Sequence, residues 1–579
     1  MWTLKNVLLT GIVAVSTLAV SDGVPQCAVP AVERMAALPE PLDVRNWSMV
    51  ARQYYGRVFD PAATGTGFPA VQVDAASGGF RMKSYLDGDP QQESMVCLGG
   101  VLGMRLAGLD ARAWHGFDFV QACKAWFDPE TGFYRHTPGQ RGGEIHGDIY
   151  GYWPALQGML FAALWPGDAD FVRHREAAIQ SFDVIAKGCG CPGKADFDVL
   201  GWNLKNACPG GRKEPMNRLS HAPTVAWALM VGAELRQDAA MAERARAALR
   251  WQFAQNSGRY EMTFLPVAVT AARLNCMSGG MQNPLDLGAA LKVWFGDYPD
   301  GTSTWAITSG TRCQGITCDG LDGARWGRDG FYAFTMGSLQ GPSWLVPVAR
   351  YEPRYARAIA KYALHAANSA RLLQGYGLTD VQQDHAAWKR KDDPERLMFY
   401  EGLKAWSPDP SHGYSPYATG DPMLLGWGNG RTKIPPVEYL ARRDAEFSSG
   451  CGNIALYMGN QVGFLGGILR LTDMPGVLAW DCLATDWYHG PAWPTWLVYN
   501  PHLMAHTVDL PLRNDEVFFD PATGGGVDVM RVSDRVGRVT LAADAAHVFV
   551  SIPATEVIVR QSNGCVTARG RVIAFSKSR

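Results

Sequence analysis

The sequence lacks the motifs of several enzyme and binding-protein classes. It contains no nucleophile elbow G-x-S-x-G, no P-loop, no H-E-x-x-H and no G-x-G-x-x-G motif between a predicted strand and helix. Charged residues make up 19% of the chain, the net charge is −1 and the pI is about 6.9. Such a chain has no field that recruits nucleic acid or an anionic membrane. These absences argue against phosphate-binding enzymes, zinc proteases and nucleic-acid partners.

Long apolar runs are also scarce. Val7 to Val20 is uncharged and mostly apolar, follows a single lysine and ends in small residues, as is typical of an export signal. The run is shorter than the roughly 20 residues that a membrane-spanning helix needs. We therefore expect residues 1–22 to be a signal peptide. The protein would then be periplasmic or secreted, without stable membrane insertion after cleavage. The alternative is a retained N-terminal anchor.

CxxC pairs at zinc-site spacing are absent, although the chain has 12 cysteines. In an oxidising compartment we expect one or two loop disulfides, among Cys189, Cys191 and Cys208 or between Cys313 and Cys318. Cys97, Cys123 and Cys482 are predicted to be buried in helices. The sequence predicts no cofactor and no metal ion.

Hydrophobic content of 47% describes a well-buried globular chain. Helical stretches alternate with glycine- and aromatic-rich loops over most of the chain. They are predicted at 93–109, 153–164, 171–185, 222–237, 239–253, 353–373 and 461–471. Repeated helix pairs favour six hairpins in a toroid, the (α/α)6 barrel, over residues 23–505. Period-two patterning from His506 predicts a small C-terminal antiparallel β module over 506–579, packed against the toroid. The predicted fold class is therefore mainly α, with an (α/α)6 toroid followed by this module.

Carboxylates in loops rich in glycine and aromatic residues are the remaining groups that could carry chemistry. Four such clusters lie at residues 143–154, at 319–331, at 400–402 with 414–422, and at 485–500. Acid-catalysed glycoside cleavage needs one carboxyl with a raised pKa and a second kept ionised. The candidate catalytic residues are Glu401, Asp329, Asp486 and Asp148.

Local context suggests the roles of two of these carboxylates. Glu401 follows Phe399 and Tyr400, so burial is expected to raise its pKa. Asp329 lies beside Arg328, which would keep it ionised. Each carboxylate also has a structural interpretation, as a helix cap or an arginine partner.

Sugar rings bind through apolar C–H faces to flat aromatic side chains. The segment Thr485–Asn500 holds a carboxylate, a histidine and five aromatic rings within a backbone stiffened by prolines, which is typical of a preorganised pocket wall. It would equally suit an aromatic core segment that closes a helical barrel. The candidate substrate-binding residues are Tyr152, Trp326, Tyr400, Asp421, Trp427, Tyr488, His489 and Trp493. Trp227 and Trp251 lie in predicted helices and are expected in the core.

At these residues the chain resembles the six-hairpin glycosidase superfamily, the (α/α)6 glycoside hydrolases. The segment from Asp486 to Asn500 is similar to the aromatic Gly-Pro-x-Trp-Pro stretch that some of them carry near the end of the toroid. The chain is also similar to a group of large uncharacterised secreted bacterial proteins, through residues 415–421, 483–486 and 499–501. The resemblance implies the toroid, a carbohydrate substrate and an inverting acid–base mechanism.

Three hypotheses remain open at this point. The first is an exported glycoside hydrolase acting on a poly- or oligosaccharide. The second is a polysaccharide lyase on the same barrel, with Tyr488, His489 or Tyr152 as the base and Arg325 to neutralise the uronate carboxylate. A related possibility is another lyase or a dehydratase that uses Cys318. The third is a glycan-binding protein without catalysis.

Overall fold

The computed structural model describes residues 25–575 except 211–220, 256–260, 278–282, 299–304, 314–315, 326–330, 384, 405–417, 420–453 and 563. The predicted signal peptide lies outside the described residues and stays a prediction. In the part of the chain that is described, no helix is both long and apolar enough to cross a membrane.

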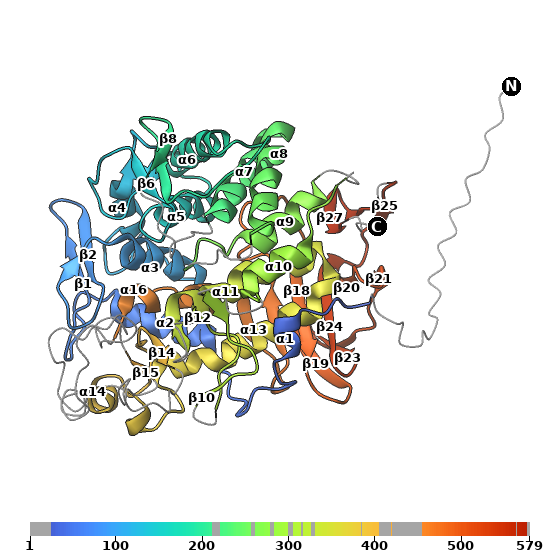
Figure 1. Ribbon diagram of the computed structural model, residues 1–579. Helices are drawn as coiled ribbons and strands as arrows, with labels where there is room; N and C mark the ends of the chain where they lie inside the picture. The colour runs from blue at the N-terminus through green and yellow to red at the C-terminus, as the bar shows by residue number, and fades with distance from the viewer. Residues whose placement is uncertain are drawn as a thin grey trace.

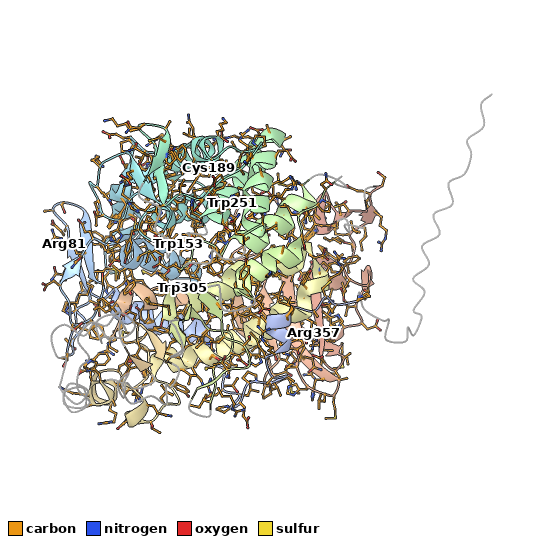
Figure 2. All side chains as sticks on the ribbon, viewed as in Figure 1. Arg81, Trp153, Cys189, Trp251, Trp305 and Arg357 are labelled. Carbon is orange, nitrogen blue, oxygen red and sulfur yellow. The ribbon has the colours of Figure 1, made fainter. Side chains whose placement is uncertain are left out.

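A ring of buried helices forms the centre of the molecule (Figure 1). Each helix of the ring contacts the next, and the last contacts the first, in the order α3 (Ser94–Leu106), α5 (Tyr152–Leu164), α7 (Ala222–Arg236), α9 (Val267–Cys276), α11 (Thr335–Leu345) and α17 (Val462–Ile468). These helices are buried over most of their length on every face. Trp153 of α5, for example, lies fully buried inside the ring (Figure 2).

A second set of helices packs outside this ring and shows the amphipathic pattern of half-buried helices. They are α2 (Trp47–Val58), α6 (Ala169–Gly188), α8 (Ala239–Phe253), α10 (Leu287–Phe295) and α13 (Ala356–Ala370). Four of them begin at a side-chain cap, because the carboxylate or amide of Asn46, Asp168, Asp238 or Asp286 accepts a free backbone N–H of the first turn. Each outer helix precedes an inner one in the chain, so the sequence folds as helix pairs.

Antiparallel sheets make up the C-terminal part, which begins at Leu469. One sheet has the strand order β16 (Leu469–Leu471), β17 (Leu478–Asp481), β18 (Thr495–Asn500), β24 (Ala545–Pro553), β20 (Glu516–Asp520) and β21 (Gly525–Gly526). A second has the order β19 (His506–Pro511), β23 (Val536–Leu541) and β22 (Met530–Ser533), and a third β25 (Ile558–Arg560), β26 (Val566–Ala568) and β27 (Arg571–Ala574).

Two apolar clusters join these sheets. One holds Val498, Leu510 and Phe549, and the other holds Phe519, Val550 and Ile573. The predicted boundary between residues 505 and 506 therefore falls inside this β region, because strands β16 to β18 precede it. The helix predicted over 461–471 ends at Ile468 and continues directly into β16.

A smaller sheet lies at the N-terminal end of α11. Its order is β15 (Ala418–Thr419), β14 (Gly402–Lys404), β13 (Phe331–Phe334), β12 (Asp322–Arg325) and β9 (Trp305–Ile307). Another, formed by β1 (Val71–Asp74), β2 (Gly79–Lys83) and β3 (Pro90–Gln91), immediately precedes α3. Strands and loops therefore build up the end of the ring at which α3 and α11 begin.

The cysteines correct one prediction. Cys189, Cys191 and Cys208 are free thiols, so a disulfide among them is wrong. Cys318 is disulfide-bonded, and the side chain of Cys313 lies outside the described part, so their pairing stays a prediction. Cys97 and Cys123 are buried in helical segments, whereas Cys482 is buried just after strand β17.

Candidate functional site

Glu401 lies beneath a pair of tyrosine hydroxyls. Its side chain is 3% exposed. The Tyr85 hydroxyl donates to Oε2 at 3.1 Å and the Tyr457 hydroxyl donates to Oε1 at 2.9 Å. The two tyrosine rings meet edge to face with centroids 5.4 Å apart. Donors on both oxygens match an ionised carboxylate, which only accepts hydrogen bonds.

The rings that flank Glu401 in sequence turn away from it. Tyr400 is fully buried, and its hydroxyl donates to Gln383 Oε1 at 3.2 Å. Phe399 packs against Trp47 and Tyr54 in the core. The prediction of Tyr400 as a substrate-binding ring is therefore wrong, because successive side chains of an extended segment point to opposite sides.

A second carboxylate, Glu93, lies in the same network. Its Oε2 accepts a hydrogen bond from the Ser84 hydroxyl, and Ser84 directly precedes Tyr85. The Ser84 carbonyl also accepts the backbone N–H of Tyr457 at 3.2 Å. Burial raises the pKa of Glu93, opposed by the Ser84 hydrogen bond. The same short stretch therefore connects Glu93, whose carboxyl favours its proton, with the tyrosine hydroxyl that donates to Glu401.

Tyr150 is the exposed aromatic ring of this site. Half of its side chain, 52%, is open to solvent. Burial of the hydroxyl end and the negative charges of Glu261, Glu93, Asp148 and Glu401 raise its pKa. A phenol that feels the charge of four carboxylates lies close to all of them. The arrangement therefore places an open, flat ring within electrostatic range of the acidic groups.

Asp148 belongs to this group but also shapes its own loop. Its Oδ1 accepts the Tyr150 backbone N–H at 3.0 Å, and its carbonyl accepts that of Trp153 at 3.1 Å. Burial raises its pKa above the ordinary value, opposed first by the Tyr150 hydrogen bond. The helix-cap interpretation does not hold, because α5 begins after Gly151 without a side-chain cap.

Two further residues complete the neighbourhood. His136 stacks edge to face on Tyr150 at 4.8 Å, and its Nδ1 lies 3.3 Å from the Ser94 hydroxyl; burial lowers its pKa. Glu261 has a left-handed backbone with φ +47°, which is unusual for a residue with a side chain. Such conformations recur at functional sites, so Glu261 is a further candidate.

All these groups lie where ring helices begin. Glu93 is the N-cap residue of α3, Asp148 precedes α5 and the Glu401 carbonyl accepts the N–H of Thr335, the first residue of α11. Helix N-termini carry partial positive charge, which stabilises nearby anions. The start of the ring is thus suited to holding several carboxylates together.

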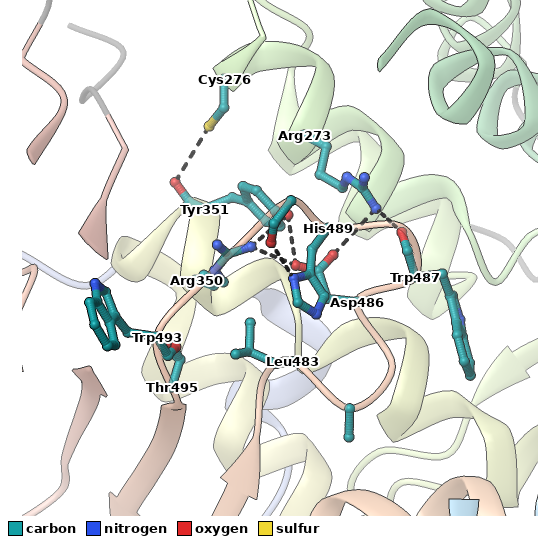
Figure 3. Close-up of polar contacts among 12 residues, drawn as sticks. Arg273, Cys276, Arg350, Tyr351, Leu483, Asp486, Trp487, His489, Trp493 and Thr495 are labelled. Carbon is teal, nitrogen blue, oxygen red and sulfur yellow. Dashed lines mark hydrogen bonds and ion pairs between the residues drawn. The ribbon is translucent and has the colours of Figure 1, made fainter. Parts of the chain in front are cut away.

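Asp486 lies at the opposite end of the ring, where several polar contacts converge on its carboxylate (Figure 3). Its carboxylate accepts hydrogen bonds from Arg350 Nη1 at 2.8 Å and from the Tyr351 hydroxyl at 2.7 Å, and lies 3.4 Å from Arg273 Nη1. Arg273 is in the last turn of α9, and Arg350 follows the end of α11. Helix α11 spans 11 residues, a length of about 16 Å. Glu401 contacts its first residue, whereas Asp486 contacts Arg350 beyond its last.

The surroundings of Asp486 are those of a structural residue. It is 1% exposed, and Arg273 is also paired with Glu234 near the end of α7. The Asp486 loop therefore fastens the ends of three ring segments. Asp486 and Glu401, both predicted as catalytic residues, do not share one site, because their partners come from opposite helix ends.

Other predicted binding residues also have structural surroundings. Tyr152 is fully buried against Phe182 and His221. Trp493 is 9% exposed, and its Nε1 donates to the Ala568 carbonyl at 3.2 Å inside the β region. Neither ring is open to a substrate, so both predictions are wrong.

Tyr488 and His489 line a separate cavity of about 360 Å³ at the Asp486 end, together with Glu234, Arg350 and Phe575. The Tyr488 hydroxyl donates to the Met159 carbonyl. These residues do not join the carboxylate group around Tyr150. The candidates Trp326, Asp329, Asp421 and Trp427 lie outside the described residues.

The sequence reasoning missed Glu93, Tyr85, Tyr457 and Tyr150. Tyr150 lies two residues after Asp148, inside the carboxylate cluster at residues 143–154, but the sequence does not show that its ring is exposed. Glu93 was placed at the start of a helix and interpreted only as part of it. Among the described residues, no group of three or more His, Cys, Asp and Glu side chains could hold a metal ion.

Comparisons with known proteins give only distant matches. No family model matches the chain, and no curated protein matches. A GH127 β-L-arabinofuranosidase from Geobacillus stearothermophilus aligns over 92% of this chain and 85% of its own, at 11% identity and a TM-score of 0.34. A cellulase of C. cellulolyticum aligns over 73% and 98%, at 11% identity and a TM-score of 0.35. A second GH127 β-arabinofuranosidase aligns over 95% and 84%, at 11% identity and a TM-score of 0.31. Neither fold nor activity follows from likenesses this weak.

Proposed function

We propose that the protein is an exported glycoside hydrolase that cleaves a poly- or oligosaccharide with paired carboxylates, on a helical ring of the (α/α)6 toroid type. The observation that carries the proposal is the group at the start of the ring. It combines Glu401 under two tyrosine hydroxyls, Glu93 with a raised pKa, and the half-exposed ring of Tyr150. Glycoside cleavage needs this combination of an acid, a base and a flat apolar surface.

In this mechanism Glu93 is the general acid and Glu401 the general base. Glu93 gives its proton to the glycosidic oxygen as the bond to the anomeric carbon breaks. A water molecule attacks that carbon, and its proton passes to Glu401. Tyr150 supports the sugar ring, and Tyr85 and Tyr457 hold the Glu401 carboxylate in one orientation. Glu401 thus takes the role opposite to the one suggested by its sequence neighbours.

Asp148 is the alternative general acid, because burial also raises its pKa. Its Oδ1 is engaged by the Tyr150 N–H, whereas among the described residues the Glu93 carboxylate accepts a hydrogen bond from the Ser84 hydroxyl alone. This difference favours Glu93, whose oxygens have fewer backbone partners to break.

Mass spectrometry of products from a panel of neutral and uronic-acid glycans tests the activity. Hydrolysis adds one water per cleavage. The variants Glu401→Gln and Glu93→Gln are expected to lower turnover by about 10²- to 10⁴-fold each, as for loss of a general acid or base. Glu144→Gln is the matched control, because Glu144 is a nearby exposed carboxylate whose side chain is 48% open. It should retain activity.

Other outcomes identify the alternatives. Products of unchanged summed mass would replace hydrolysis by a lyase reaction. Binding without products, unaffected by the carboxylate substitutions, would identify a glycan-binding protein. A turnover loss in Asp148→Asn but not in Glu93→Gln would reassign the acid.

Inversion and export are separate parts of the proposal. Proton NMR of the first product formed distinguishes inversion from retention at the anomeric carbon, and a retained anomer would make Glu401 a nucleophile. N-terminal sequencing of protein from the periplasm or medium tests export. A mature chain that begins near residue 23 is expected, and an intact N-terminus in the cytoplasm would refute it.

A further inference from the structure

The segment from Leu397 to Glu401 is held at nearly every backbone group. The N–H groups of Leu397 and Met398 donate to Asp393 at 2.8 and 3.0 Å. The Tyr400 N–H donates to the Leu373 carbonyl at 2.8 Å, and the Tyr400 carbonyl accepts the Thr335 hydroxyl at 2.7 Å. The position of the Glu401 carboxylate is therefore set by these anchors.

One of the anchors is a buried ion pair. Lys389, on helix α14 (Ala386–Asp392), and Asp393 are both 0% exposed, and Nζ lies 2.8 Å from Asp393 Oδ2. The same Nζ donates to the Met398 carbonyl and lies 4.9 Å from the centre of the Tyr400 ring. The pair thus contacts Leu397, Met398 and Tyr400, the residues leading into Glu401.

A buried ion pair is a poor source of stability, because desolvation offsets its attraction and a well-packed apolar pair often serves as well. What this pair provides is geometry: one ammonium and one carboxylate fix three consecutive peptide groups in place. We infer that Lys389 and Asp393 are positioning residues for the Glu401 carboxylate and that their charge state controls its reactivity. The activity part of this inference rests on the proposed function.

The surroundings of Lys389 give the pair a pH dependence. Burial lowers the pKa of Lys389 to about 8, opposed by Asp393 and aided by the positive charges of Arg396 and Arg45. Tyr54 and Tyr400 also face the pair. Above about pH 8 the lysine loses its proton, and Asp393 loses the ammonium charge that pairs with its Oδ2. We therefore expect turnover to fall on the alkaline side with a midpoint near pH 8.

This fall differs from alkaline unfolding. A lysine whose pKa is lower in the folded than in the unfolded state weakens folding while it is charged. The contribution of Lys389 to the free energy of unfolding therefore becomes more favourable as the pH rises from about 8 towards the pKa of lysine in the unfolded state. Activity and stability should change in opposite directions over this range.

The double variant Lys389→Met with Asp393→Asn tests the inference, since it removes both charges and leaves neither one unpaired in the core. The control is Arg390→Met with Asp380→Asn, an exposed ion pair that includes the same helix, with side chains 55% and 58% open. We expect kcat to fall about 10- to 100-fold in the double variant, as for a displaced catalytic group, with KM within about twofold and the alkaline limb lost. A limb that persists near pH 8 would overturn the inference.

Hydrogen–deuterium exchange gives a readout that needs no activity. Peptides covering 397–401 should exchange faster in the double variant than in the control, at one fixed pH. If the wild-type protein cleaves no glycan, the proposed function fails and exchange alone decides this inference. Unchanged exchange would then overturn it, and faster exchange would support it.

Discussion

Replacing Asp486 with Asn separates a structural from a catalytic role. The substitution keeps the size of the side chain but removes the charge that faces Arg350 and Arg273. Removing one partner of a buried ion pair costs about 3–5 kcal/mol. Arg273 keeps Glu234 as a partner, whereas Arg350 is left with Tyr351. We therefore expect Asp486→Asn to lower the free energy of unfolding by about 3 kcal/mol, the lower end of that range.

The assay combines thermal unfolding with turnover per folded molecule. Asp486→Asn should unfold at a clearly lower temperature while the folded fraction keeps its turnover. Glu401→Gln should show the reverse, with turnover lost and the unfolding temperature nearly unchanged. If Asp486→Asn instead abolished turnover at unchanged stability, the assignment of the two helix ends would be refuted.

Three further predictions concern single residues. Tyr150→Phe should keep the KM of the wild-type protein and Tyr150→Ala should raise it, since stacking needs the ring and not the hydroxyl. Equal KM values for the two variants in steady-state kinetics would contradict this prediction. Trp493→Ala should cost about 3–5 kcal/mol in unfolding experiments without changing KM, because the ring is core; a selective rise in KM would restore it as a binding residue. Burial raises the pKa of Asp319 to about 6, so between about pH 4 and pH 6 the folded state holds a proton that the unfolded state releases. The free energy of unfolding should therefore fall by about 3 kcal/mol as the pH rises from about 4 to about 6. Asp319→Asn should flatten that part of a stability profile measured by urea unfolding.

Helices were readable from the sequence because their signals are local. The three- and four-residue spacing over 353–373 predicts one long helix, and the structure has a 3-10 turn, helix α13 and a second 3-10 turn there. The β region was placed too late, because Leu469-Arg470-Leu471 continues the apolar pattern of the preceding helix. Its pairing with β17 depends on residues further along the chain.

The candidate site was only partly predictable for the same reason. Glu401 was selected for its neighbouring rings, but the hydroxyls that contact it come from residues 316 and 56 positions away. Asp486 looked equivalent, because its arginine partners lie 213 and 136 positions away. Both carboxylates lie in aromatic-rich sequence segments, and only the fold shows that Asp486 is the one paired with arginines.

The ring is completed by α17, whose contacts have a consequence for biosynthesis. Gly463 lies directly on the backbone of Gly103, where a larger side chain would collide, and α17 also contacts α11. The ribosome makes α3 hundreds of residues before α17, at about 5–20 residues per second. In the nascent chain the apolar flank of α3 is therefore uncovered for tens of seconds and that of α11 for a shorter time. Export in an unfolded state would postpone that exposure until the last helix and the strands that follow it arrive together.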